Sequence, residues 1–254
     1  QALLESKSRD FNAVPGSGKT SLLTAKLLLI ARKWPYDNKG LCVISHTTVA
    51  RDQIALRLAR TEEGSRLLKY PHFVGTIHAF VNQFLSLKML PVLGMQAHVI
   101  DNDFFAAQVK KKLKGHRFYT LRAWLDRQAN ADLLVSTLTF KGPNLIVMSE
   151  EGAIPAESSK SGSQIRTIKL ELAKEGIFRH SDMFAFAQSA LEHYPELLDI
   201  VHRRFPMVFI DEMQDTSWDQ ESLLNRVFDG RSVMQRFGDV DQQIMTGETD
   251  RALC

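Results

Sequence analysis

A segment near the start of the chain has the composition of a phosphate-binding loop. It reads Ala13-Val14-Pro15-Gly16-Ser17-Gly18-Lys19-Thr20 and lies between an apolar run and a helical pattern. Glycines let consecutive backbone N–H groups turn towards phosphate oxygens, and the amino end of a helix adds partial positive charge. In such a loop Lys19 contacts the β- and γ-phosphates and the Thr20 hydroxyl ligates Mg²⁺. A chance Gly-Ser turn before a lysine is the alternative. The residues expected to hold a nucleotide are Pro15, Gly16, Ser17, Gly18, Lys19, Thr20 and Ser21.

A second candidate site is an apolar strand that ends in two carboxylates. Val208-Phe209-Ile210 is followed directly by Asp211 and Glu212. Buried parallel strands carry acids at their carboxyl ends when those acids face a site at the sheet edge. In an enzyme with a phosphate loop, the first acid holds Mg²⁺ and the second activates the attacking water. The alternative is a solvated strand end.

These residues need elements that bring them to one edge of a sheet. Short apolar runs alternate along the chain with helical patterns, which is typical of a parallel sheet wrapped by helices. We expect strands at 10–14, 41–45, 73–75, 207–210 and 232–237, and helices at 20–33, 48–60, 77–87, 182–194, 195–204 and 218–228.

The middle of the chain has a different pattern, and we expect a mostly helical subdomain at 98–177 inserted into an α/β domain formed by 1–97 and 178–254. Lys141-Gly142-Pro143 is a plausible hairpin turn. The segment at 149–163 is rich in Glu, Ser, Gly and Ala, which predicts a mobile loop. Helices are expected at 103–114 and 121–129, and hairpin strands at 134–140 and 144–148.

The acidic strand end continues as Asp211-Glu212-Met213-Gln214-Asp215-Thr216. Together with the phosphate loop, this segment resembles the first two motifs of the UvrD/Rep branch of superfamily 1 DNA helicases. Other segments resemble further motifs of that family in the right order. They are Ser45-His46-Thr47-Thr48-Val49-Ala50 (motif Ia), Gly75-Thr76-Ile77-His78-Ala79-Phe80 (motif Ib) and Gly238-Asp239-Val240-Asp241-Gln242-Gln243-Ile244 (third motif).

The resemblance implies a RecA-like P-loop fold, ATP and Mg²⁺ as cofactors, and single-stranded and duplex DNA as partners. It also implies roles for individual residues. Lys19 and Thr20 would serve the phosphates and Mg²⁺, Asp211 the metal, and Glu212 would be the catalytic base. Gln214 and Gln242 would sense the γ-phosphate and link hydrolysis to DNA, with Gln242 counted among the catalytic residues. Thr47, Thr76 and His78 would line the single-strand path, and Gln1 could belong to an adenine-reading motif.

Two segments depart from the family pattern. Motif Ia has His46-Thr47-Thr48 where the family has Phe-Thr-Asn. After the third motif, Met245, Thr246, Gly247 and Glu248 stand where the family has aromatic residues and an arginine. Aromatic stacking is a main sequence-tolerant contact with single strands. The residues that contact the bases are therefore an open question, whereas the ATP chemistry is unaffected.

The function expected from these motifs is that of an ATP-hydrolysing motor domain in a DNA helicase. The sequence stops soon after the third motif, so we expect a fragment whose second RecA-like domain lies elsewhere. An arginine supplied across such a cleft is worth about 10³–10⁵ in rate. These 254 residues alone should therefore bind ATP but hydrolyse it slowly. The alternatives are another class of P-loop NTPase, or a nucleic-acid-binding module with a vestigial ATP site.

The composition fits this class without proving it. The net charge of +3 permits nucleic acid as a partner, and two cysteines cannot form a disulfide framework. No apolar run is long enough to span a bilayer, so a cytoplasmic protein is expected. The tryptophans Trp34, Trp124 and Trp218 are expected to be packing residues. His78 could equally be a core histidine. The cations of the middle segment form either a contact surface for duplex DNA or a solvated helix face: Lys110, Lys111, Lys112, Lys114, His116, Arg117, Arg122 and Arg127.

Overall fold

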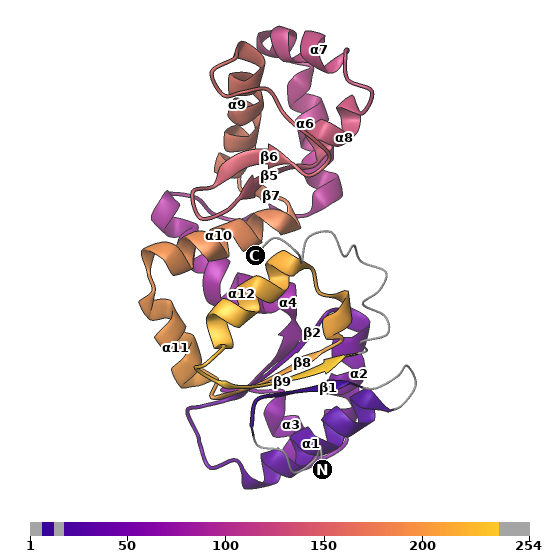
Figure 1. Ribbon diagram of the computed structural model, residues 1–254, viewed down its shortest axis with the longest axis vertical. Helices are drawn as coiled ribbons and strands as arrows, with labels where there is room; N and C mark the ends of the chain where they lie inside the picture. Colours follow the sequence, from indigo (N-terminus) through magenta and orange to yellow (C-terminus); the bar gives the residue numbers. More distant parts are fainter. Residues whose placement is uncertain (1–6, 13–17, 239–254) are drawn as a thin grey trace. The chain divides into compact units, whose positions relative to one another are not determined.

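The computed structural model describes residues 7–12 and 18–238, which form two compact units (Figure 1). Unit 1 consists of Gln1–Phe80 and Glu196–Cys254, and unit 2 is the continuous segment Val81–Pro195. The expected subdomain at 98–177 lies within unit 2. The interpretations placed on Gln1, Gln242 and the segment 15–17 fall outside the described residues.

Unit 1 is built on a parallel five-stranded sheet, which confirms the predicted α/β class. The strand order is β1-β9-β8-β2-β3. Every residue of β2 is buried, as expected for a parallel strand covered on both faces. The strands are β1 (Arg9–Asn12), β2 (Leu41–Ser45), β3 (Phe73–Thr76), β8 (Met207–Asp211) and β9 (Val233–Gly238).

Helices cover both faces of this sheet (Figure 1). On one face Leu23, Leu27 and Leu58 form a core with Val43 and Phe209. On the other face the Phe80 ring lies 6.4 Å from that of Phe205 and 5.2 Å from that of Phe228. The first face carries α1 (Lys19–Lys33), α2 (Thr48–Leu58) and α3 (Glu62–Leu67), and the second carries α4 (Ile77–Val81), α11 (Glu196–Arg204) and α12 (Trp218–Phe228).

Unit 2 is mostly helical and has its own core, in which Phe105, Phe140, Phe178 and Phe186 are buried. Its longer helices are α6 (Asn102–Leu113), α7 (Tyr119–Leu125), α8 (Ala131–Ser136), α9 (Lys160–Lys174) and α10 (His180–His193). Its strands form two small sheets, β4 (Val99–Ile100) with β7 (Ile177–Phe178), and β5 (Leu138–Lys141) with β6 (Ile146–Ser149). Short helical turns complete it: η1 (Asn82–Ser86), α5 (Leu87–Met89), η2 (Pro91–Leu93) and η3 (His116–Phe118).

Several predicted elements of unit 2 were wrong in their type or extent. The strand expected at 134–140 begins only at Leu138, because the preceding residues form α8. A short apolar run fits either a helix or a strand, so periodicity could not separate the two. Helix α9 was missed, and it begins inside the segment predicted as a loop, where the Ser159 hydroxyl caps it by accepting from the Gly162 N–H. The helix expected at 77–87 contains a π-helical turn at 82–86.

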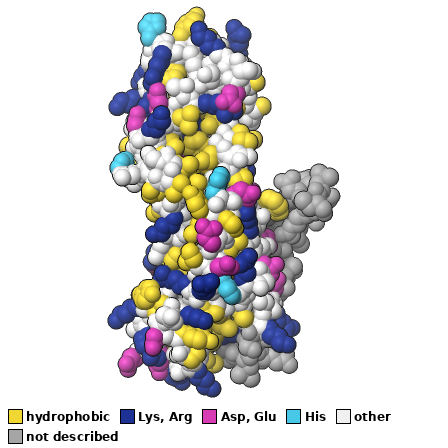
Figure 2. Space-filling view, turned by 90° about the vertical axis from the view of Figure 1, so that its left-hand side faces the viewer, with side chains coloured by type: hydrophobic (Ala, Val, Ile, Leu, Met, Phe, Trp, Pro, Cys, Tyr) yellow, Lys and Arg dark blue, Asp and Glu magenta, His cyan; other side chains and the backbone are white. Residues whose placement is uncertain are grey.

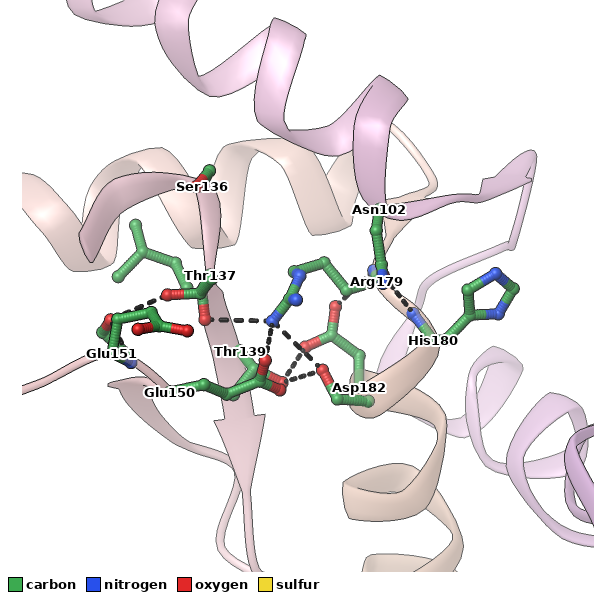
Figure 3. A network of polar contacts seen from close by, with 12 residues as sticks. Asn102, Ser136, Thr137, Thr139, Glu150, Glu151, Arg179, His180 and Asp182 are labelled. Atoms are coloured by element: carbon green, nitrogen blue, oxygen red, sulfur yellow. Dashed lines mark hydrogen bonds and ion pairs between the residues drawn. The ribbon is translucent and has the colours of Figure 1, made fainter. Parts of the chain in front are cut away.

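A buried ion pair joins α9 and α10 to the hairpin of unit 2, and Figure 3 shows the polar contacts of its acid, Asp182, with Thr139 and Arg179. The Lys169 ammonium lies 2.6 Å from an Asp182 carboxylate oxygen, and both side chains are almost fully buried. Asp182 also accepts hydrogen bonds from the Thr139 hydroxyl and from the backbone N–H groups of Phe140 and Arg179. Burial lowers the pKa of Lys169 to about 8, while the Asp182 carboxylate opposes that shift. The Asp182 carboxylate thus links α9, α10 and β5.

Two further observations concern the exposure of apolar residues. Trp34 and Trp124 are half-buried, as expected of packing residues, but Trp218 is 61% exposed at the start of α12. The packing role expected for Trp218 was therefore wrong, because as the first residue of α12 it lies outside the turns that contact the sheet. Within 7–12 and 18–238, no helix has both the length and the apolar character needed to cross a membrane.

Candidate functional site

The carboxyl edge of the unit 1 sheet brings the sequence motifs together. Ser45 is the register partner of both Asp211 and Thr76, so the ends of β8, β2 and β3 lie side by side. Strand β9 lies between β1 and β8, and Asn12 pairs with Gly238. The carboxyl ends of β1, β8 and β9 therefore lie at one edge of the sheet, where ligands bind in open α/β sheets.

The start of α1 has the geometry that the phosphate loop predicts. Gly18 has φ +85° and caps the helix, a left-handed conformation that side chains other than glycine rarely adopt. Lys19 is the first residue of α1, so its side chain starts at the amino end of the helix. The Ser21 hydroxyl accepts a hydrogen bond from Arg57 of α2. Position 18 thus needs glycine, and the helix end offers the positive dipole that phosphate prefers.

Asp211 is buried at this edge, and its carboxylate lacks a well-formed hydrogen bond among the described residues. Its side chain lies on the same sheet face as that of Phe209, two residues earlier, which is the face covered by α1. Among the described residues, neither carboxylate oxygen meets a donor at hydrogen-bond geometry. Burial, and then the neighbouring Glu212 carboxylate, raise the pKa of Asp211 to about 6, while the backbone N–H of Glu212 and then Lys19 act in the opposite direction. A buried anion in this state has an unmet requirement for a cation.

The same edge holds other buried polar atoms that lack a hydrogen-bond partner among the described residues. Within the described part of the chain, His46 Nδ1 and Thr216 Oγ1 are also buried without a hydrogen-bond partner. His46 follows β2 and Thr216 follows β8, so these atoms come from the same two neighbouring strands. Buried polar groups are nearly always satisfied in folded proteins. Their gathering at one edge indicates a site shaped for a ligand rather than for packing.

Glu212 and Gln214 form a strained turn directly after β8. Glu212 has φ +57°, one of two positive values among the described non-glycine residues, and such strain concentrates at functional sites. The Gln214 amide donates a hydrogen bond to the Glu212 carboxylate. A Cβ atom on Gly238 would lie 3.2 Å from the Gln214 side-chain oxygen. Gly238, which opens the third motif, thus leaves the room that Gln214 occupies.

The three residues predicted to line a nucleic-acid path follow β2 and β3 at the same edge. The Thr47 hydroxyl accepts from the Ala50 N–H at 3.1 Å, which caps α2. The Thr76 hydroxyl accepts from the Ala79 N–H at 3.2 Å, at the start of α4. His78 lies half-buried within α4. Both threonines therefore have a local structural role in addition to the predicted one.

Three of the eight basic residues of the middle segment form ion pairs within unit 2, and a fourth binds backbone carbonyls. Lys112 and Arg117 both contact Glu171 of α9, at 3.2 and 2.6 Å. Lys110 contacts Asp132 at 3.0 Å. Arg122 donates to the backbone carbonyls of Leu113 and Gly115. These contacts favour the interpretation of a solvated helix face over that of a duplex-binding surface, because much of the positive charge is already balanced.

Sequence reasoning missed two features of this edge. Nothing in the sequence indicated that Arg57 would bind Ser21, because the contact spans 36 positions along the chain. The unsatisfied nitrogen of His46 was also missed, although its departure from the family pattern was a signal. His46 and Arg57 both lie in the part of the chain that follows β2.

The parallel sheet, the glycine-capped first helix and the acidic end of β8 define the class of P-loop nucleotide-binding domains. Within that class, residues 11–246 match the model of the UvrD/REP helicase N-terminal domain. The chain belongs to this family, which settles the alternative of another P-loop class.

Similarity to individual proteins supports the same assignment. The chain is 26% identical over 252 residues to the ATP-dependent DNA helicase srs2 of Schizosaccharomyces pombe, a match that covers 91% of this chain and 27% of that protein. It is 34% identical over 70 residues to an ATP-dependent helicase/nuclease of Lactococcus lactis subsp. lactis and to the exonuclease/helicase protein RexA of L. lactis subsp. cremoris. Each of these two matches covers 28% of this chain and 6% of the relative.

Proposed function

We propose that the carboxyl edge of the unit 1 sheet binds and hydrolyses Mg-ATP. In this proposal the chain is the motor domain of a cytoplasmic DNA helicase that moves along single-stranded DNA and unwinds duplex. The observation that carries the proposal is the buried, partnerless carboxylate of Asp211 at the end of β8, judged among the described residues. Family membership and the helicase relatives support it. The chain spans about a quarter or less of the length of these relatives, so the activity of a whole helicase belongs to the proposal.

The residues present fit Mg²⁺ and a nucleotide. Asp211 offers a carboxylate with no competing donor among the described residues, and Thr20 offers a hydroxyl in the first turn of α1. When bound, Mg²⁺ neutralises charge on the phosphates. Lys19 and the N–H groups of the first turn of α1 would hold the phosphate oxygens, together with 15–17, Gly18 and Ser21. Gln1 would contact the base in this proposal.

Proton transfer falls to Glu212 in this proposal. Its backbone conformation turns the residue out of the β8 direction, and the Gln214 amide fixes the carboxylate by donating to it. Glu212 would accept the proton of the attacking water. Gln214 and Gln242 would report the state of the γ-phosphate to the DNA path formed by Thr47, Thr76 and His78. In the family, arginines of a second RecA-like domain complete the site, so these 254 residues alone should hydrolyse ATP slowly.

Isothermal titration calorimetry with Mg-ATP tests the nucleotide assignment. Lys19→Ala should abolish measurable binding, because the lysine supplies the charge nearest the phosphates. Lys33→Ala, at the far end of the same helix, is the matched control and should bind as the wild type does. Equal affinity of the Lys19→Ala and wild-type proteins would contradict the proposal, and absence of binding in both would point to a vestigial site.

Fluorescence anisotropy with a labelled oligonucleotide tests the DNA path. Binding should be sequence-tolerant and should weaken as salt rises, because phosphate contacts release counterions. A Thr76→Ala/His78→Ala double variant should bind more weakly than Lys111→Ala, which changes an exposed residue of unit 2. An affinity that neither salt nor the double variant changes would show that the path lies elsewhere.

A further inference from the structure

A pocket lies at the amino edge of the unit 1 sheet, opposite the candidate ATP site. It has a volume of about 270 Å³ and is formed by the loops that enter β2 and β3 and by the ends of α1 and α3. Strand β2 separates the two edges by five residues, or on the order of 15 Å at about 3.3 Å per residue. A ligand here would leave the nucleotide edge open. The residues that matter below are Trp34, Tyr36, Arg66, Lys69, Tyr70 and His72.

The aromatic walls of this pocket are fixed in place. The Trp34 indole N–H donates to the Lys39 carbonyl at 2.8 Å, and its ring meets Tyr36 edge-on at 5.4 Å. His72 Nδ1 accepts from the Leu41 N–H at 2.9 Å, so the neutral imidazole carries its proton on Nε2. Burial, and then Arg66, lower the pKa of His72, which favours this neutral form. A preorganised wall reduces the entropy lost on binding.

The lining of the pocket carries two cations and two acids, and further cations lie beside it. Arg66 and Lys69 are exposed lining residues, whereas the lining acid Glu63 is paired with Arg32 at 3.4 Å. Asp37 is the other acid of the lining. The Lys39 ammonium lies over the Tyr36 ring at 4.9 Å, and the Arg204 guanidinium lies over the Tyr70 ring at 4.9 Å. Figure 2 shows hydrophobic side chains interspersed with basic and acidic side chains on one face of the protein.

From these observations we infer that the pocket docks an acidic peptide segment of a partner protein, with one large apolar side chain inserted between the aromatic walls. The volume suits a single side chain of the size of Phe or Leu rather than a folded surface. The cations around it complement carboxylates that flank such an anchor. A stacked nucleobase is less well matched, because Lys39 and Arg204 already cover one face of Tyr36 and Tyr70, and Trp34 presents its ring to Tyr36. This inference does not depend on the proposed ATP or DNA chemistry.

Binding of a synthetic peptide to the whole 254-residue chain tests the inference. The probe is a fluorescein-labelled peptide, Gly-Asp-Glu-Asp-Phe-Asp-Gly, followed by anisotropy. Replacing its Phe by Ala should weaken binding by about 10- to 150-fold, which is the effect of losing one buried aromatic side chain. Replacing its acids by Lys should abolish binding. Tripling the salt should weaken the complex, since exposed charge pairs are screened.

Charge reversal on the protein provides the matched comparison. Arg66→Glu/Lys69→Glu should weaken peptide binding at least about tenfold, because like charges then face each other. Lys111→Glu/Lys114→Glu makes the same change in net charge on exposed residues of unit 2 and should leave the affinity unchanged. Lys69→Glu alone should weaken binding in the same direction. Because this variant keeps Arg66, weaker binding in it cannot come from losing the hydrogen bond between Arg66 and the Ala31 carbonyl.

Intrinsic fluorescence locates the bound peptide. An unlabelled peptide should change the tryptophan emission of the wild type and of Trp124→Phe but not of Trp34→Phe. Three results would overturn the inference: no saturable binding at millimolar peptide, equal affinity in both charge-reversed proteins, or competition by oligo(dT) that binds Trp34 more tightly than the peptide does. Because Lys19→Ala should bind the peptide normally, failure of this test and failure of the ATP assignment are distinguishable.

Discussion

Two buried aspartates, one in each unit, differ in the hydrogen bonds that their carboxylates accept. Asp182 of unit 2 accepts four hydrogen bonds, one of them from a buried lysine. Asp211 of unit 1 is equally buried, yet no described residue satisfies its oxygens. Both are acids of the same type, close to a strand end or a helix start. The difference shows that burial of a carboxylate alone does not mark a candidate site, whereas burial without a described partner, at the carboxyl edge of a parallel sheet, makes it a candidate.

The largest expected effect comes from breaking the satisfied pair. Lys169→Met leaves the Asp182 charge buried without its cation, which should cost about 3–5 kcal/mol of unfolding free energy. Urea denaturation followed by circular dichroism measures it. Lys110→Met is the control, because its pair with Asp132 is exposed and should contribute about 0–1 kcal/mol. If the two variants lose equal stability, Asp182 has no special dependence on Lys169 and the comparison fails.

The next effect has the opposite sign and concerns Asp211. Asp211→Asn should stabilise the nucleotide-free protein at neutral pH, by up to about 3 kcal/mol for a pKa raised from 3.8 to about 6. The folded wild type binds the extra proton between these two values, so its stability should rise as pH falls from about 6 towards 4. Thermal melts from pH 4 to 8 should show that the stability difference between Asp211→Asn and the wild type shrinks as pH falls, a comparison in which the titration of other groups cancels. The variant should also lose the Mg²⁺ dependence of ATP binding.

A stability change of the opposite sign in Asp211→Asn would be equally informative. If Asp211→Asn destabilises the nucleotide-free protein at pH 7, then the carboxylate has a partner outside the described residues, and its role would resemble that of Asp182. The same melts decide this, since the sign of the change separates the two cases.

His72, at the opposite edge of the sheet, should respond to pH in the reverse direction. The pKa of His72 is lowered, so its contribution to stability is complete above the unfolded value of 6.5 and is lost as pH falls below it. His72→Ala should cost about 1–3 kcal/mol at pH 7.5, because the buried Leu41 N–H loses its acceptor. The difference from wild type should shrink below pH 6. A difference that stays constant from pH 5 to 8 would contradict the assigned neutral form.

The smallest effect is expected at Gly238. Gly238→Ala places a methyl group 3.2 Å from the Gln214 side-chain oxygen, which should cost about 1 kcal/mol and displace that side chain. ATP affinity should fall while the stability of unit 2 is unchanged. Gly230→Ala makes the same chemical change at a glycine with open space around it and tests stability loss alone, since its φ is +66°. Normal ATP affinity in Gly238→Ala would show that Gln214 is not coupled to the site.

The sequence predicted unit 1 far better than unit 2. The bounds expected for β2 and α12 agree with the structure, because a continuous apolar run and a Ser217 cap are strong local signals. In unit 2, α8 was missed because its short apolar run fits a strand equally well, and α9 was missed because polar residues separate its apolar ones. The motifs led directly to Asp211, but the absence of a described partner for its carboxylate depends on the positions of other elements. The Lys169–Asp182 pair had no sequence signal, because Lys169 lies on a helix that the pattern did not reveal.

The strand order has a consequence for how the chain is made. Unit 2 is one continuous segment, whereas the unit 1 sheet draws strands from both sides of it. Strand β1 pairs only with β9 among the described strands, and β8 separates β9 from β2. During synthesis from the amino end, β1 therefore has no neighbouring strand until β9, the last described strand, has been made. Unit 2 can complete its local contacts earlier, since they close over short stretches of chain. The carboxyl edge of the unit 1 sheet is consequently completed only after unit 2 has been made, and the proposed ATP site cannot form there until β8 and β9 have left the ribosome.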